Sequence, residues 1–118
     1  MPTDPPVFAA HLADDLSPED IIQVLTLLRG DIENLVTALE SAARAGDAKG
    51  FRAAAHGLAG AAGSVAAEPL EQVSRRAMTN LDPDAPLVAT AGEIRAIADE
   101  TLRQIAGVLA GGVPPAAT

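Results

Sequence analysis

Apolar residues recur every three or four positions along most of this chain, and this helical spacing strongly constrains the possible folds. Gly, Pro and Asp residues divide the pattern into segments. Alanine, the best helix former and a poor strand former, occupies 26 of the 118 positions, twice the 13 of leucine. The β-branched and aromatic runs that strands need are nearly absent. The sequence therefore predicts an all-α fold.

Four amphipathic helices are predicted, near residues 18–45, 48–66, 69–80 and 85–110. Ser17 and Pro18 form a clear start signal, because Ser caps the first amide groups of a helix and Pro suits its first position. Gly30 and Asp31 mark a candidate break within the first helix. A weaker pattern over residues 7–12 predicts a short N-terminal helix. Short connections between such helices favour an antiparallel up-down four-helix bundle.

The length fits a single domain. We expect the helical bundle to span residues 7–110, between Pro-rich disordered tails at 1–6 and 111–118. The formal net charge of −8 argues against binding to nucleic acid or to an anionic membrane, since both need clustered Lys and Arg. The absence of Cys excludes disulfides and thiolate chemistry. No signal peptide or membrane-spanning stretch is evident, so a cytoplasmic protein is expected.

His56 is the residue that carries chemistry. The apolar stripe of its helix centres near Leu58 and Ala62, and His56 lies roughly 160° from that centre. The imidazole is therefore expected to face solvent, where its neutral form is a nucleophile able to form a covalent intermediate. No His or Cys lies three or four residues away as a second metal ligand, and nothing positions a Ser-His-Asp hydrolase site.

Three glycines surround this histidine on its helix: Gly57, Gly60 and Gly63. Each interior helical Gly costs about 1 kcal/mol relative to Ala, and Lys, Glu or Gln is more usual on an exposed face. One interpretation is that a partner protein must reach the imidazole across a bare surface. The other, which stays open at this point, is that the glycines accommodate a neighbouring helix or tail.

The run from Ala55 to Val65, AHGLAGAAGSV, resembles the signature of histidine phosphotransfer (HPt) domains, which is approximately A-H-x-[LI]-K-G-x-x-x-x-x-G. The residues that match are Ala55, His56, Leu58 and Gly60. The upstream Phe-Arg-Ala-Ala segment and the helix layout also fit. The similarity covers roughly residues 20 to 80.

The resemblance implies a four-helix bundle in which His56 accepts a phosphoryl group and relays it between a kinase or receiver aspartate and a receiver. The expected partners are a response-regulator receiver domain, a sensor histidine kinase, or both, without nucleic acid or membrane. The chain would be a monomer and a phosphocarrier rather than an enzyme with its own ATP site. No cofactor is expected on it, because Mg²⁺ would belong to the partner receiver. Gly60 would give the partner room.

Two positions depart from the signature. Its Lys, three residues after the histidine, is Ala59 here, and its last Gly is Ala66. The Lys is expected to neutralise phosphate oxygens, and Arg52, one turn before His56, is the first candidate to replace it. Around the phosphate or on the docking surface we expect Arg52, Lys49, Ala59, Gly60 and Gly63.

Two further points stay open. Arg75 and Arg76, on the next helix, are additional candidate cations whose direction the sequence leaves undecided. The missing Lys also favours an alternative function, a non-transferring adaptor that docks to a receiver or kinase without carrying phosphate. A histidine-kinase dimerisation helix pair is less favoured, because Gly57 follows the histidine and the next Pro after it is Pro69.

Overall fold

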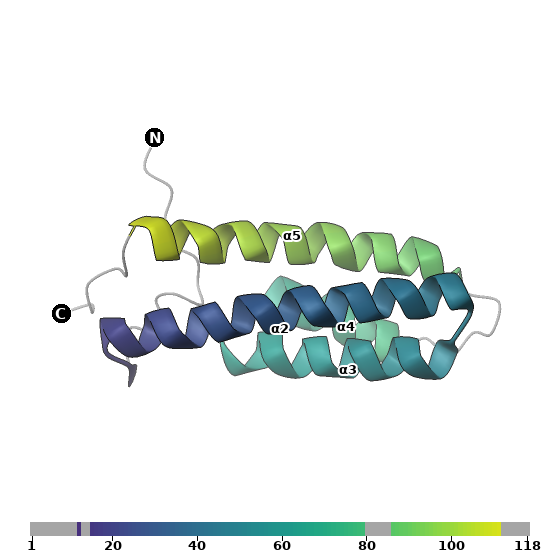
Figure 1. Cartoon of the computed structure of the whole chain (residues 1–118). Coiled ribbons are helices and arrows are strands. Elements are labelled where there is room, and N and C mark those ends of the chain that lie inside the picture. The colour runs from purple at the N-terminus through teal and green to yellow at the C-terminus, as the bar shows by residue number, and fades with distance from the viewer. Residues whose placement is uncertain (1–11, 13–14, 80–85, 112–118) are drawn as a thin grey trace.

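The computed structural model describes residue 12, residues 15–79 and residues 86–111, and in this part of the chain all regular structure is helical. The long helices are α2 (Pro18–Ala45), α3 (Ala48–Ser64), α4 (Glu68–Thr79) and α5 (Leu87–Gly111). They form a ring in which α2 contacts α3 and α5, and α4 contacts the same two helices (Figure 1). The predicted all-α, antiparallel four-helix bundle is confirmed. None of these helices is long and apolar enough to cross a membrane.

The predicted break at Gly30 is wrong, because α2 runs through it without interruption. Gly30 is exposed, and its cost in helix propensity, about 1 kcal/mol, is offset by burial of Leu28 and Ile32 on either side. Gly111, expected in the C-terminal tail, instead forms the last residue of α5. The rest of both predicted tails lies outside the described residues. Of the predicted N-terminal helix only Leu12 is described, and it is helical and buried.

Local capping explains where α2 and α3 begin and end. Ser17 accepts a hydrogen bond from the backbone N–H of Asp20 at 3.2 Å, and Pro18 opens the helix. Gly46 ends α2 in the left-handed conformation, with φ of 69°. The side chain of Asp47 then accepts from the N–H of Gly50 at 2.9 Å and so caps the start of α3. The two helices therefore meet in a tight antiparallel connection.

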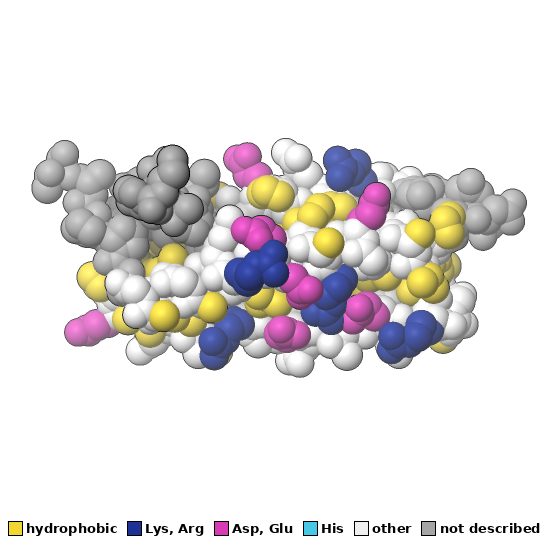
Figure 2. Space-filling view, turned by 90° about the horizontal axis from the view of Figure 1, so that it is seen from above, with side chains coloured by type: hydrophobic (Ala, Val, Ile, Leu, Met, Phe, Trp, Pro, Cys, Tyr) yellow, Lys and Arg dark blue, Asp and Glu magenta, His cyan; other side chains and the backbone are white. Residues whose placement is uncertain are grey.

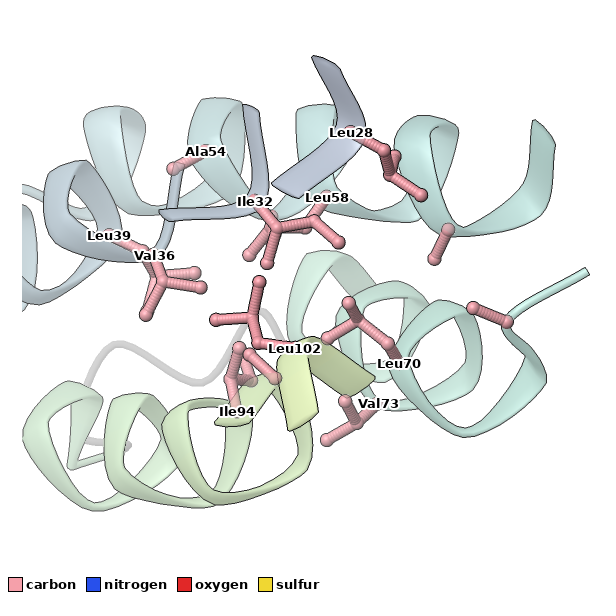
Figure 3. Close-up of a cluster of buried hydrophobic side chains, with 14 of the residues drawn as sticks. Leu28, Ile32, Val36, Leu39, Ala54, Leu58, Leu70, Val73, Ile94 and Leu102 are labelled. Carbon is pink, nitrogen blue, oxygen red and sulfur yellow. The ribbon is translucent and has the colours of Figure 1, made fainter. Parts of the chain in front are cut away.

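The core lies along the axis of the ring, and all four helices contribute to it (Figure 3). α2 provides mainly large aliphatic side chains, whereas four of the six buried residues of α3 are alanine. Fully buried side chains from the four helices include Ile32, Leu39, Phe51, Leu58, Leu70, Ile94 and Ile105. Small residues on α3 allow α2 and α4 to approach its backbone closely on both sides.

A charged network joins α5 to α2 on the side of the bundle away from α3. Arg95 donates two hydrogen bonds to Glu40, at 2.6 and 3.2 Å, and a third to Asp99 at 3.3 Å. This bidentate pair holds the pKa of Glu40 below its usual value, mainly through the hydrogen bond from the guanidinium. Figure 2, seen from above, shows acidic and basic side chains interspersed on this side.

The link between α3 and α4 contains a strained residue. Ala66 has φ of 59°, in the left-handed region that favours glycine, and the N–H of Ala67 closes the helix end by donating to the carbonyl of Ala62 at 2.9 Å. Ala66 stands where the HPt signature has glycine. A positive φ at this position explains why glycine suits it, and in this chain alanine adopts that φ.

The strain predicts that Ala66→Gly stabilises the fold by roughly 0.5–1 kcal/mol, because Gly adopts this φ without the Cβ penalty. Urea unfolding followed by circular dichroism measures the effect. The matched control is Ala53→Gly, the same change at an exposed position inside α3, which we expect to lose about 1 kcal/mol. Equal losses in both variants would contradict the interpretation.

The network on α5 predicts a pH-dependent contribution from Glu40. Glu40→Gln should cost about 1 kcal/mol at pH 7, because it removes a charge-assisted pair that is largely shielded from solvent. The folded-state pKa of Glu40 is lowered, so its stabilisation is present above the unfolded value of about 4.3 and disappears as pH falls through the folded value. The difference in unfolding free energy between variant and wild type should therefore shrink below about pH 4.

The control for this prediction is Glu100→Gln. Glu100 pairs with Arg103 on the exposed surface of α5, where such a pair contributes little. A difference at pH 7 as large as that of Glu40→Gln would contradict the special role of the α2–α5 pair.

Candidate functional site

The site is built on α3, a helix with one buried and one exposed side. Its buried residues are Phe51, Ala54, Ala55, Leu58, Ala59 and Ala62. His56 lies on the opposite side and is exposed. The prediction that its imidazole faces solvent is confirmed, and the cause is the position of the apolar stripe.

The exposed side of α3 changes in character along its length. Arg52 and Lys49 lie one and two turns before His56, while Gly60 and Gly63 lie one and two turns after it, and all five residues are exposed. The spacing of three and four residues places them in one row. The row therefore offers positive charge on one side of the imidazole and bare backbone on the other.

A groove of about 590 Å³ opens beside the imidazole, between α2 and α3. It is lined by Asp31, Asn34, Leu35, His56, Gly57, Gly60 and Ala61. Its floor is mostly small or apolar, and one carboxylate and one amide come from α2. The groove contains no Lys or Arg among its lining residues, so any cation for an anionic group on His56 must come from elsewhere.

The three glycines that follow His56 on α3 have different surroundings. A Cβ atom on Gly57 would lie 2.8 Å from Cδ2 of Leu35 on α2, and one on Gly63 would lie 2.6 Å from Oε2 of Glu71 on α4. A Cβ on Gly60 would meet nothing within 4 Å. Side-chain ends from neighbouring helices thus lie beside Gly57 and Gly63, as one of the two interpretations expected. Packing gives no reason for Gly60, which lies one turn from the imidazole.

Ala59 was expected around the phosphate or on the docking surface, and the structure places it at the edge of the buried stripe of α3. Ala59 is only 6% exposed. Three residues after His56 along a helix correspond to about 300°, which brings Ala59 back to the edge of the buried stripe. Arg52 and Lys49, in contrast, are exposed.

Sequence reasoning missed Asp31 and Asn34, which line the groove from α2. Asp31 was interpreted only as part of a helix break. Both residues lie within one helical turn of the apolar Leu35, and this spacing was the signal that could have placed them beside the groove. The missing information was that α2 packs beside the His56 side of α3, and this depends on the order of helices in the bundle.

The family model for the Hpt domain matches residues 23–108. The chain belongs to the Hpt domain family. No curated protein and no solved structure gives a significant match. Hpt domains are histidine phosphotransfer modules of two-component phosphorelays, phosphocarriers that interact with receiver or kinase domains.

The geometry suits such a phosphocarrier. The imidazole of His56 is exposed beside an open groove, and its helix is held rigidly by core contacts on the far side. Among the described residues, no group of three or more His, Asp or Glu side chains is placed to hold a metal ion. The arrangement presents a nucleophile beside an open groove.

Proposed function

We propose that this Hpt domain carries a phosphoryl group on His56 and relays it between a kinase or receiver aspartate and a response-regulator receiver. The observation that supports this most directly is the exposed His56 one turn from Gly60, the glycine that packing does not require. Open backbone beside a nucleophile allows a second protein to bring a reacting phosphorus atom to the ring.

The proposed transfer is an in-line displacement at phosphorus. A neutral ring nitrogen of His56 attacks the phosphoryl group of a receiver aspartyl phosphate, and the new nitrogen–phosphorus bond forms as the phosphorus–oxygen bond breaks. The aspartate leaves as a carboxylate with the bonding electron pair, and the second ring nitrogen keeps its proton. The receiver supplies Mg²⁺ and most of the electrostatic stabilisation. The reverse reaction passes the group to the next receiver.

Charges on α3 support the phosphorylated state. A phosphoryl group adds close to two negative charges to a chain that already carries a net charge of −8. Arg52 is one turn before His56 and exposed, so we expect its guanidinium to approach the phosphoryl oxygens, with Lys49 one turn farther along the same row.

The first prediction concerns the acceptor. His56→Gln should abolish acid-labile phosphate on the chain after incubation with a phosphorylated receiver, while the melting temperature stays nearly unchanged because the side chain is exposed. His11→Gln is the matched control and should label like the wild type. Undiminished labelling of His56→Gln would contradict the proposal.

A separate outcome would favour the adaptor alternative. In that case the wild-type chain would bind a receiver, measured by calorimetry, yet take no phosphoryl group from it. Binding with transfer supports the phosphocarrier, and binding without transfer overturns it.

The second prediction concerns Gly60. Gly60→Glu should stabilise the fold by several tenths of a kcal/mol, because Glu has the higher helix propensity and a side chain there meets open space. Transfer should nevertheless slow, because the new side chain adds bulk and negative charge beside the phosphoryl position. Urea unfolding and phosphotransfer rates measure the two effects.

The matched control is Gly92→Glu. Gly92 is exposed inside α5, has the same open space around it, and lies on a helix that does not border α3. It should gain similar stability and transfer at the wild-type rate. If Gly60→Glu also transferred at the wild-type rate, the open surface at Gly60 would have no role in docking.

A further inference from the structure

An ion pair on α4 lies against the exposed side of α3. The carboxylate of Glu71 lies beside Gly63: a Cβ atom on Gly63 would be 2.6 Å from Oε2 of Glu71. The same oxygen accepts a hydrogen bond from Nη2 of Arg75 at 2.7 Å. The side chain of Glu71 is 24% exposed, whereas that of Arg75 is 67% exposed. The carboxylate of Glu71 is therefore mostly buried against α3, whereas the guanidinium of Arg75 is mostly in solvent.

The direction of α4 brings Arg75 toward His56. A three-residue link joins α3 to α4, so the two helices run antiparallel (Figure 1). Glu71 is opposite Gly63, and Arg75 starts one turn later on α4, which corresponds to one turn closer to His56 on α3. Counted from this contact, Arg75 is level with Ala59, about 5 Å along the axis from His56.

The two sides of His56 differ in charge. The groove on the α2 side contributes Asp31 and Asn34, which offer no positive charge to a phosphoryl dianion. On the α4 side, Ala59 is a small buried residue, so no side chain of α3 separates the imidazole from Arg75 at that level. A new dianion on His56 would therefore compete with Glu71 for one guanidinium.

We propose that Arg75 is a switchable cation for the phosphorylated site: it pairs with Glu71 in the resting chain and turns to the phosphoryl group on His56. The inference rests on the proposed function, because it requires a phosphohistidine. Arg75 stabilises the charged product by pairing directly with the phosphoryl group, and Glu71 sets how readily the guanidinium is released. Arg76, one position along α4, points about 100° away and serves as the matched control.

The test is a phosphorus NMR titration of the full chain after phosphorylation with phosphoramidate, which transfers its phosphoryl group to imidazole without a protein partner. A signal absent from His56→Gln is assigned to His56. A nearby cation favours the doubly ionised phosphoryl group and raises its acid dissociation constant. For an exposed pair, losing that cation should change the constant about two- to fivefold.

Arg75→Ala should therefore lower the acid dissociation constant of the phosphoryl group two- to fivefold, and Arg76→Ala should leave it within error of the wild type. Glu71→Gln should raise it, because the guanidinium is released. In the Glu71→Gln, Arg75→Ala double variant, most of that rise should disappear, which separates release of Arg75 from the direct loss of a negative charge.

The outcomes separate the two proposals. A labelled wild-type chain whose constant does not change in Arg75→Ala, or changes equally in Arg76→Ala, overturns the role of Arg75 and leaves the phosphocarrier intact. A chain that takes no phosphoryl group on His56 from phosphoramidate or from any phosphorylated receiver overturns the proposed function itself. Circular dichroism verifies that each variant folds, as expected for exposed substitutions.

Discussion

The packing of α3 between its two neighbours is the constraint on which the site depends. Four of the six buried residues of this helix are alanine, so α2 and α4 approach its backbone closely on either side. Leu35 reaches Gly57 from α2, and Glu71 reaches Gly63 from α4. The same contacts leave the remaining side of the helix in solvent and fix the direction of His56. Core packing and presentation of the nucleophile are therefore consequences of one stripe of small residues.

The glycines show how function can be recognised from energetic cost. Three interior helical glycines cost about 3 kcal/mol together, a large part of the 5–15 kcal/mol that stabilises a typical domain. For Gly57 and Gly63 the cost has a local cause, because a neighbouring side chain occupies the Cβ position. For Gly60 no such cause exists in the described part of the chain. Gly30, Gly92 and Gly107 also meet open space inside helices, so an unpacked helical glycine alone does not indicate function. Gly60 differs from them because it lies one turn from the exposed imidazole.

Much of the fold was predictable because periodicity and capping are local. The apolar stripes identified the four long helices, and most boundaries were right to within two residues, with Ser17 and Gly46 acting as the sequence indicated. Gly30 was misleading because burial of its neighbours outweighed its propensity. The pair between Arg95 and Glu40 joins residues 55 positions apart, so no local pattern contains it. The exposure of His56 followed from helical geometry, whereas the contribution of Asp31 to the groove required the helix order.

The two departures from the HPt signature have different physical meanings. Ala66 retains the left-handed backbone that ends α3 and carries its strain, so the turn toward α4 is preserved. Ala59 is only 6% exposed and lies at the edge of the buried stripe of α3. A chain with alanine here must obtain positive charge from other positions, such as the row before His56 or the exposed surface of α4. The placement of charge around the histidine thus follows from how closely two helices pack, rather than from the signature of α3 alone.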